Sequence, residues 1–158
     1  MISADWPAVR SIYTEGIHSG IATFETQAPD WDDWNSGHLT SCRLVAIVDQ
    51  QVAGWTALSP VSSRCVYGGV AEVSVYVGNA FQRRGVGAAL LRSLIEYSEN
   101  EGLWCLQAAI MAKNTASIHL HEKAGFRKVG YREKIGRLRG EWQDSILMEK
   151  RSQVIGVD

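Results

Sequence analysis

One segment near the middle of the chain constrains the fold more than any other. Val70–Val77 is rich in β-branched residues and alternates apolar with polar side chains, which predicts a strand. A long helix is predicted over Gly85–Glu101, because apolar residues recur there at helical spacing and Gly102 can end it in a left-handed cap. Trp104–Met111 is predicted to be a further strand. Strands and a helix in this succession favour an α/β domain.

The rest of the chain adds short elements to this unit. Two β-rich runs separated only by Gln50–Gln51 predict an antiparallel hairpin. The strands expected in all cover residues 21–26, 43–49, 52–59, 70–77, 104–111, 126–133 and 141–150. The predicted fold class is α/β (α+β), a mixed, mostly antiparallel, twisted sheet of about seven strands flanked by about four helices. At ~100–200 residues per domain, residues 1–158 form a single domain.

Composition argues against several classes of protein. The 16 Lys and Arg residues against 17 Asp and Glu leave a net charge of −1, so no basic field attracts nucleic acid or an anionic membrane. No apolar run approaches the ~18–20 residues of a membrane span, and the first residues do not resemble a signal peptide. Three widely spaced cysteines predict neither a disulfide framework nor a metal site. We expect a reduced, cytoplasmic protein with no metal, no nucleic acid and no membrane partner.

The strand predicted over Val70–Val77 carries polar side chains on one face. Because strand side chains alternate, one face holds Ala71, Val73, Val75 and Val77, and the other holds Glu72, Ser74 and Tyr76. Two interpretations of this feature are equally supported when it is taken alone. The strand is antiparallel with a solvated face, or Glu72 and Ser74 belong to a site.

The turn before the long helix has the composition of an anion-binding site. Gly85 and Gly87 lie at the mouth of the helix, where free backbone N–H groups and the positive end of the helix dipole accumulate. Glycine lets a backbone approach a pyrophosphate closely, and Arg83 and Arg84 add positive charge. The turn is not a Walker motif, and Leu90 stands where a dinucleotide-binding turn has its third glycine.

Two later segments bear on the same site. Asn114, Ser117 and His121 share one face of a helix predicted over residues 115–124, although the pattern taken alone favours a helix cap followed by a solvated stripe. Six basic residues against one acid fill Arg127–Arg139. This run predicts a solvated hairpin, with contact to a cofactor phosphate or to a second subunit as alternatives.

Taken together, these segments resemble the GNAT family of N-acetyltransferases. Gln82–Gly87 fits the family's Q/R-x-x-G-x-G/A motif between a strand and a helix, and Asn114–Phe126 follows at the family's distance. More narrowly, the chain is similar to the branch that acetylates phosphinothricin and methionine sulfone or sulfoximine. The segments that carry this similarity are Ala22–Thr26, Ser74–Val77, Leu120–Phe126 and Trp142–Asp144.

The resemblance implies acetyl-CoA as co-substrate and a set of contacts with it. In the family the strand backbone pairs with pantetheine, which implies this contact for Val75, Tyr76 and Val77. The turn holds the pyrophosphate, which implies contacts for Arg83, Arg84, Gly85, Val86, Gly87 and Ala88. The later helix contacts the arm of the cofactor, here through Asn114 and Ser117. The amine substrate is expected to contact Phe24, Glu25, Ser62, Ser63, Arg64, Glu72, Val73 and Ser74. The family also implies a homodimer.

The reaction implied is direct attack of a free amine on an acetyl thioester. Glu72 is the expected base for the ammonium, and the N–H of Val75 is the expected donor to the oxyanion. Arg64 could hold a substrate carboxylate with two parallel hydrogen bonds. His121 stands where many members carry a tyrosine acid, so the sequence leaves open whether it protonates the leaving thiolate or only packs.

The predicted function is N-acetylation of a small amino-acid-like amine such as L-phosphinothricin, methionine sulfoximine or methionine sulfone. Within the same chemistry, the alternatives are a protein amino terminus, an aminoglycoside or a polyamine, although Arg64 disfavours polycations. A different class remains open, a non-catalytic sensor that binds acyl-CoA. Retention of both Glu72 and Arg64 disfavours that class.

Overall fold

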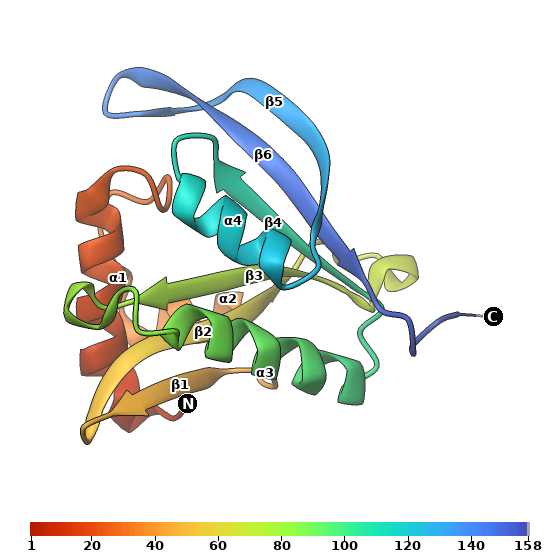
Figure 1. The fold of residues 1–158 in the computed structure, drawn as a ribbon, viewed down its shortest axis with the longest axis horizontal. Helices are drawn as coiled ribbons and strands as arrows, with labels where there is room; N and C mark the ends of the chain where they lie inside the picture. The colour runs from red at the N-terminus through yellow and green to blue at the C-terminus, as the bar shows by residue number, and fades with distance from the viewer. Residues whose placement is uncertain (158) are drawn as a thin grey trace.

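The computed structural model describes residues 1–157, which form one mixed sheet with helices on both faces (Figure 1). The sheet has six strands in the order β1-β2-β3-β4-β6-β5. The strands are β1 (Leu44–Val48), β2 (Gln51–Pro60), β3 (Val70–Val77), β4 (Cys105–Met111), β5 (Arg127–Leu138) and β6 (Glu141–Arg151). The helices are α1 (Trp6–Ser19), α2 (Trp31–Gly37), α3 (Val86–Asn100) and α4 (Thr115–Lys123), with 3-10 turns η1 (Ser3–Asp5), η2 (Cys65–Tyr67) and η3 (Asn79–Phe81).

The strand pairing confirms the predicted fold class and corrects the strand count. Neighbouring strands are antiparallel except β3 and β4, which are parallel. The sheet has six strands rather than about seven, because residues 21–26 form a loop and not the expected strand. Side-chain contacts hold this loop instead of strand pairing. Tyr76 donates a hydrogen bond to the Ala22 carbonyl at 3.4 Å, and Phe24 lies so close to Gly136 that a Cβ there would come within 2.6 Å of its ring.

Two apolar layers fix the sheet between its helices. On one face, Leu91 and Leu94 of α3 and Ile118 of α4 pack with β2 and β4. On the other, α1 and α2 pack against β2 through Trp34 and Trp55. Each fully buried leucine in the first layer contributes about 1.5–3 kcal/mol by leaving water. Among the helices of residues 1–157, none combines the length and apolar character that crossing a bilayer requires.

The hairpin of β5 and β6 is longer than the sequence predicts. The sequence predicts a strand to residue 133 and then a basic loop, whereas β5 continues to Leu138 and a tight turn follows. Arg139 and Gly140 form that turn with left-handed φ angles of 49° and 88°. At its tip, Arg139 donates to the carbonyl of Ile17 at 3.4 Å. The hairpin therefore extends beyond α4 toward the end of α1 (Figure 1).

The sheet splits at its centre, between β3 and β4. These strands pair only where Val70–Glu72 lies beside Cys105–Gln107. At this closed end, the Gly69 carbonyl accepts hydrogen bonds from the amides of Trp104 at 2.8 Å and Cys105 at 3.1 Å. Beyond Glu72 the two strands diverge, although β3 stays paired with β2 from Ala71 to Val77 (Figure 1).

Candidate active site

The split gives β3 a free backbone edge inside the protein. From Val73 to Val77 the strand pairs with β2 on one side, and no pairing with β4 is present on the other. Backbone N–H and C=O groups are obligatory hydrogen-bonding groups, so an unpaired edge can accept an extended ligand much as it would accept another strand. This edge includes Val75, Tyr76 and Val77, the residues expected to pair with pantetheine.

The start of α3 presents backbone donors beside this edge. Gly85 caps the helix with a left-handed φ of 78°, and no side chain caps it. The helix bond from the Ala89 amide to the Gly85 carbonyl is 3.0 Å, so the amides of Val86, Gly87 and Ala88 precede it and lack intrahelical partners. Three free donors at the positive end of a helix dipole are the arrangement that an anion site requires.

Glycine is favoured at Gly85 and at Gly87 for different structural reasons. A Cβ at Gly85 would meet no atom within 4 Å, so its left-handed conformation is what favours glycine there. A Cβ at Gly87 would lie 3.2 Å from Leu120 of α4 and 3.5 Å from Val77 of β3. Gly87 therefore lets α3 approach its protein neighbours, in addition to its expected place in the pyrophosphate-binding turn.

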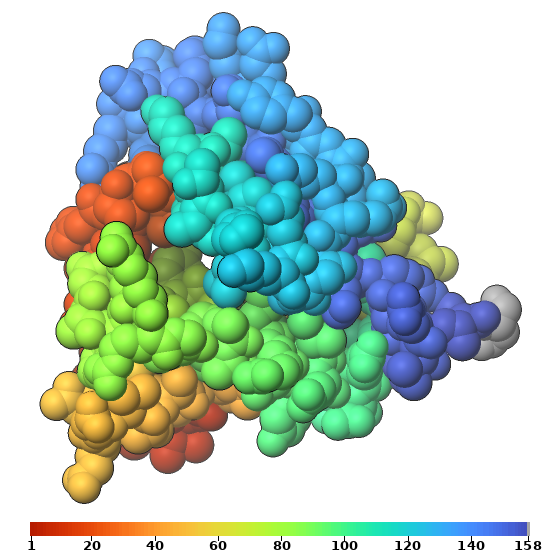
Figure 2. Space-filling view, viewed as in Figure 1, coloured from red at the N-terminus to blue at the C-terminus, as the bar shows by residue number. Residues whose placement is uncertain are grey.

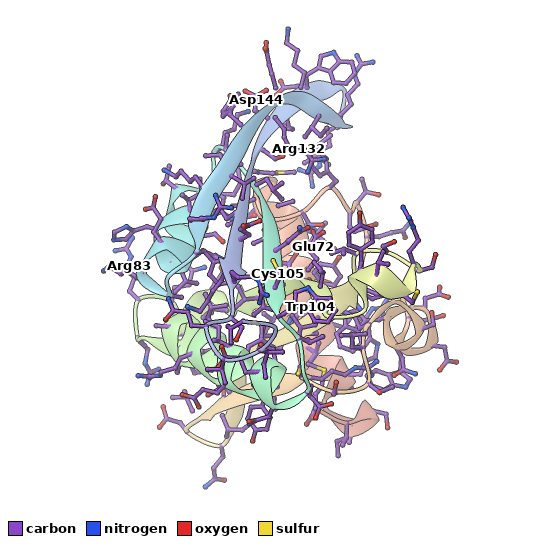
Figure 3. All side chains as sticks on the ribbon, turned by 90° about the vertical axis from the view of Figure 1, so that its right-hand side faces the viewer. Glu72, Arg83, Trp104, Cys105, Arg132 and Asp144 are labelled. Carbon is purple, nitrogen blue, oxygen red and sulfur yellow. The ribbon has the colours of Figure 1, made fainter. Side chains whose placement is uncertain are left out.

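The two arginines of the turn lie differently. The Arg84 guanidinium pairs with Asp49 at 3.4 Å and lies 5.5 Å over the ring of Phe81, which directs it toward the β1–β2 turn. Arg83, at a left-handed φ of 59°, extends into solvent at the edge of the molecule (Figure 3). Arg83 is therefore the freer of the two cations for a phosphate.

Glu72 lies on the opposite face of β3 from α3, as the alternation predicts. Val73 packs toward α3, and Tyr76 packs with α1 and α2. The Glu72 side chain is reached by solvent, yet desolvation by the surrounding strands raises the pKa of its carboxyl, and the positive charge of Arg132 opposes that rise. Arg132 belongs to β5 and lies on the Glu72 side of the sheet (Figure 3). A carboxylate with a raised pKa is suited to accept a proton near neutral pH.

Aromatic side chains continue this face along β3. Tyr76 stacks on Trp55 with ring centroids 4.7 Å apart, and Tyr13 of α1 meets Tyr76 edge-on at 5.0 Å. Burial strongly raises the pKa of Tyr76, and the charge of Glu25 raises it further, so the phenol stays protonated. The structure thus brings Glu25, from the loop after α1, to the face that carries Ser74 and Tyr76.

The predicted substrate residues of the β2–β3 connection lie beyond the closed end of the split. Ser62 accepts a hydrogen bond from the Arg64 amide at 3.2 Å, and the Arg64 guanidinium lies 5.8 Å over the ring of Tyr67. Ser63 and Arg64 are exposed. The β2–β3 register sets Ser59 opposite Glu72, so the connection begins only a few residues from the carboxylate.

The first turn of α4 confirms the expected cap. The Asn114 side chain accepts from the Ser117 amide at 3.1 Å, which leaves its NH₂ group available to a ligand. His121 is 2% exposed, and its Nδ1 lies 2.8 Å from the Ser117 carbonyl. A carbonyl only accepts, so Nδ1 carries the proton, and Nε2 is buried without a partner among the described residues. Burial lowers the pKa of His121, which favours the neutral ring.

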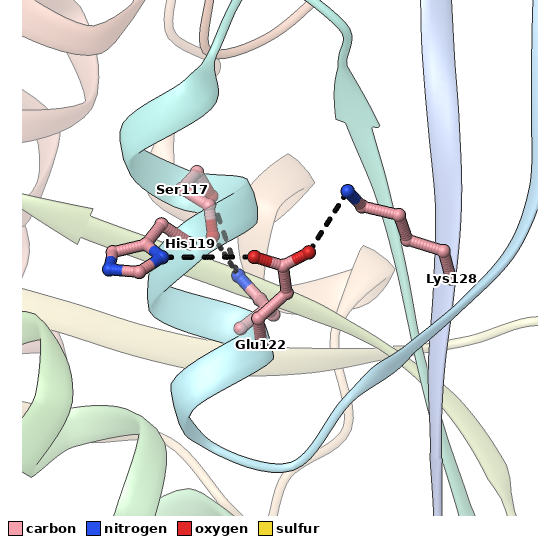
Figure 4. A network of polar contacts seen from close by, with 5 residues as sticks. Ser117, His119, Glu122 and Lys128 are labelled. Atoms are coloured by element: carbon pink, nitrogen blue, oxygen red, sulfur yellow. Dashed lines mark hydrogen bonds and ion pairs between the residues drawn. The ribbon is translucent and has the colours of Figure 1, made fainter.

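The outer side of α4 is tied to β5 by charge. Glu122 pairs with Lys128 at 2.9 Å and with His119 at 3.7 Å (Figure 4). The Lys128 hydrogen bond lowers the pKa of Glu122. These exposed groups fix the helix on the hairpin, and the unpartnered Nε2 belongs to His121 on the buried side.

Sequence reasoning missed two features of this site. Tyr13 packs against Tyr76 with the buried Trp55 behind them, and Arg132 supplies the charge that acts on Glu72. Arg132 was visible only as a member of the basic run Arg127–Arg139, because nothing local in the sequence indicates which of its residues face Glu72.

The surface is hollowed where these parts meet. Figure 2 shows a recess between the segment after α1, the η3–α3 segment and α4. A separate groove of about 560 Å³ lies between α1 and the loop after it, lined by residues that include Arg10, Glu15 and His18. No residue predicted for the site lines that groove.

The sequence profile of the Acetyltransferase (GNAT) family matches residues 6–126. The chain belongs to the GNAT acetyltransferase family. It is 34% identical over 157 residues to the phosphinothricin N-acetyltransferase of Streptomyces coelicolor, a match that covers 94% of this chain and 92% of that protein. It is 28% identical over 152 residues to the L-methionine sulfoximine/L-methionine sulfone acetyltransferase of Pseudomonas aeruginosa, covering 92% and 88%.

The fold of this GNAT enzyme is also found in solved structures. A GNAT superfamily phosphinothricin acetyltransferase from Sinorhizobium meliloti, in complex with AcCoA, matches with a TM-score of 0.89 at 25% identity. The match covers 100% of this chain and 89% of that one. The expected fold, the family and its phosphinothricin and methionine sulfone/sulfoximine branch are thus confirmed. The roles of individual residues stay predictions.

Proposed function

We propose that this GNAT enzyme transfers the acetyl group of acetyl-CoA to the amine of a small amino-acid-like acceptor of the phosphinothricin, methionine sulfoximine or methionine sulfone type. The observation that carries the proposal is the position of Glu72. It lies where β3 and β4 begin to diverge, so a ligand on the free edge of β3 ends beside a carboxylate with a raised pKa. The names of the relatives support the acceptor class.

The residues of the split fit acetyl-CoA. Free amides at Val86–Ala88 match a pyrophosphate, and the free edge of Val75–Val77 matches the amides of pantetheine. Arg83 adds a cation outside the turn (Figure 3), and the proposal assigns contacts with the pantetheine arm to the Asn114 NH₂ and the Ser117 hydroxyl. The bound acetyl-CoA contributes an activated thioester carbonyl.

Three groups of the chain then act on the acceptor. Glu72 takes a proton from the ammonium, directly or through water, which leaves a neutral nucleophile. A free N–H on the β3 edge, assigned to Val75, stabilises negative charge that develops on the carbonyl oxygen. Arg64 turns from Tyr67 to hold the acceptor carboxylate with its guanidinium fork.

His121 is proposed to return a proton to the thiolate, and the structure sets a condition for this role. Nε2 must first gain a proton, because the neutral ring carries its only proton on Nδ1. The lowered pKa confines the protonated form to the acidic end of the working range. We therefore expect the kcat ratio of wild type to His121→Asn to grow as pH falls, measured from pH 5.5 to 8.5. A constant ratio would assign the ring to packing alone.

A thiol-release assay with acetyl-CoA and a panel of amines tests the proposed function. We expect turnover on at least one of L-phosphinothricin, L-methionine sulfoximine and L-methionine sulfone, with the N-acetyl product confirmed by mass. Turnover only on a peptide amino terminus, an aminoglycoside or a polyamine would replace this acceptor class. Calorimetric binding of acetyl-CoA without turnover on any amine would indicate a sensor.

We also propose that the enzyme is a homodimer. The edge strand β5 and its neighbour expose several large apolar side chains, Val129, Tyr131, Ile135 and Trp142. Exposed apolar groups gathered on one hairpin are typical of an interaction surface. Sedimentation equilibrium is expected to give twice the chain mass, and a monomer at 100 μM would contradict the proposal.

The cytoplasmic location stays a prediction. Cys42, Cys65 and Cys105 carry free thiols.

A further inference from the structure

No contact of Arg132 with the acceptor has been assigned so far, yet the strand register sets this residue on the same face as Glu72. Arg132 pairs with Ser145 of β6, and Ser145 pairs with Met111 of β4. Gln107, four residues before Met111 on the same strand, pairs with Glu72. Partners in register share a face and residues an even number apart on one strand share it too, so Arg132, Ser145 and Glu72 all face the α1–α2 side of the sheet.

Ser145 supplies an independent sign that a ligand belongs here. It is 2% exposed, and its hydroxyl is one of the few buried polar side-chain atoms without a hydrogen-bond partner in residues 1–157. A buried hydroxyl normally finds a partner, since leaving it unpaired costs about 1–3 kcal/mol. Its cross-strand neighbour Arg132 has Cβ about 4.5–5.5 Å away by strand geometry, within easy reach of one anionic group held by both.

Arg132 is also left free by the rest of the hairpin. Arg127 pairs with Glu149, Lys128 pairs with Glu122, and Arg137 donates to the Gly140 carbonyl. Within residues 1–157, no ion pair or hydrogen bond of the Arg132 guanidinium is present.

The nearest acid on β6 does not neutralise Arg132. Asp144 projects to the opposite face, where Tyr131 and the Lys134 amide bind it (Figure 3). The positive charge of Arg132 acts instead on Glu72, across the gap between β4 and β3, where it lowers the pKa of the Glu72 carboxyl. The same face of the sheet therefore carries two opposite charges. The Glu72 carboxylate suits an ammonium, and Arg132, on the other side of the gap between β3 and β4, is a free cation.

We propose that Arg132, together with the hydroxyl of Ser145, binds an acidic group at the end of the acceptor farthest from its amine. The proposal rests on the acceptor class stated above and narrows it. Arg64 holds the α-carboxylate, Glu72 faces the amine, and Arg132 selects a phosphinate or carboxylate side chain over a neutral group of similar size. A planar guanidinium suits this task because it can donate two parallel hydrogen bonds to such a group.

The test compares two acceptors on two matched variants. Arg132→Met is expected to lower kcat/KM for L-phosphinothricin by about 10- to 100-fold, the usual effect of losing a charge-assisted hydrogen bond. The value for L-methionine sulfone, which is neutral at that end, should change less than about threefold. Arg137→Met removes a cation from the other face of the same hairpin and should leave both values unchanged. Arg132→Lys should recover part of the preference, because charge returns without the planar fork.

The outcomes separate the two proposals. Equal losses on both acceptors, or no loss on L-phosphinothricin, overturn the role of Arg132 while the acceptor class stands. Wild-type enzyme without turnover on either acceptor contradicts the proposed function and overturns this inference with it. Arg132 is exposed, so the variant should keep its fold, which thermal unfolding will check.

Discussion

Replacing Glu72 with Gln is expected to lower kcat by about 10²- to 10⁴-fold, the range for lost general acid–base help. Gln keeps the shape of the side chain and removes its capacity to take a proton from the acceptor ammonium. The measurement is steady-state thiol release at saturating acetyl-CoA with the best acceptor of the amine panel. Glu96→Gln, which removes an exposed carboxylate on the outside of α3, is the matched control and should leave kcat unchanged.

The pH profile gives the same claim a second test. Because desolvation raises the pKa of Glu72, the acid limb of kcat/KM should lie above the pH expected for an ordinary glutamate, and Glu72→Gln should lose that limb. Arg132 is the charged group that opposes the rise. A wild-type rate that does not fall on acidification, or a variant with the wild-type rate, would show that Glu72 is not the base.

The raised pKa also predicts the sign of a stability effect. Between its unfolded and folded pKa values, Glu72 binds more protons in the folded protein than in the unfolded chain, so the free energy of unfolding falls as pH rises through that window. Above the folded pKa the ionised carboxyl disfavours the fold. Glu72→Gln should therefore be at least as stable as wild type at pH 7, so its loss of activity would not reflect unfolding.

Gly85→Asp is expected to weaken acetyl-CoA binding by about 10²- to 10³-fold, since like charges brought together cost several kcal/mol. The substitution sets a carboxylate beside the free amides of Val86–Ala88, where the pyrophosphate is proposed to bind. The fold should survive, because a Cβ at this position meets no atom within 4 Å. Asp also tolerates the left-handed conformation better than most residues and is favoured at a helix N-cap.

Gly85→Asn is the matched control for that variant. Asn has nearly the same shape and the same tolerance of a left-handed φ, but no charge. Calorimetric titration with acetyl-CoA should find its Kd within about threefold of wild type if charge is the cause. Equal Kd values for Gly85→Asp and wild type would place the diphosphate elsewhere.

Features set by local chemistry could be predicted from the sequence. The alternation in β3 put Glu72 and Tyr76 on one face, Gly102 adopts the left-handed conformation expected after α3, and Asn114 caps α4. Each depends on backbone geometry within a few residues. The apolar face of β3 could also be predicted, because side chains alternate between the two faces of any strand.

Features set by distant contacts could not be predicted. The loop at residues 21–26 has the composition of a strand but is held by Tyr76 and Gly136, which lie far along the chain. The full length of β5, and with it the approach of Arg132 to Glu72, depends on pairing with β6 across the sheet. The packing of Gly87 against α4 and β3 depends on segments outside its own turn, so the local sequence does not indicate it.

A crystal structure of the enzyme with bound CoA will show whether the coenzyme occupies the split between β3 and β4. We expect the diphosphate over the amides of Val86–Ala88, the pantetheine along the free edge of β3, and the sulfur end directed toward the Glu72 side of the sheet. CoA bound in the groove that Arg10 and His18 line, with the split between β3 and β4 filled by protein or solvent, would contradict it.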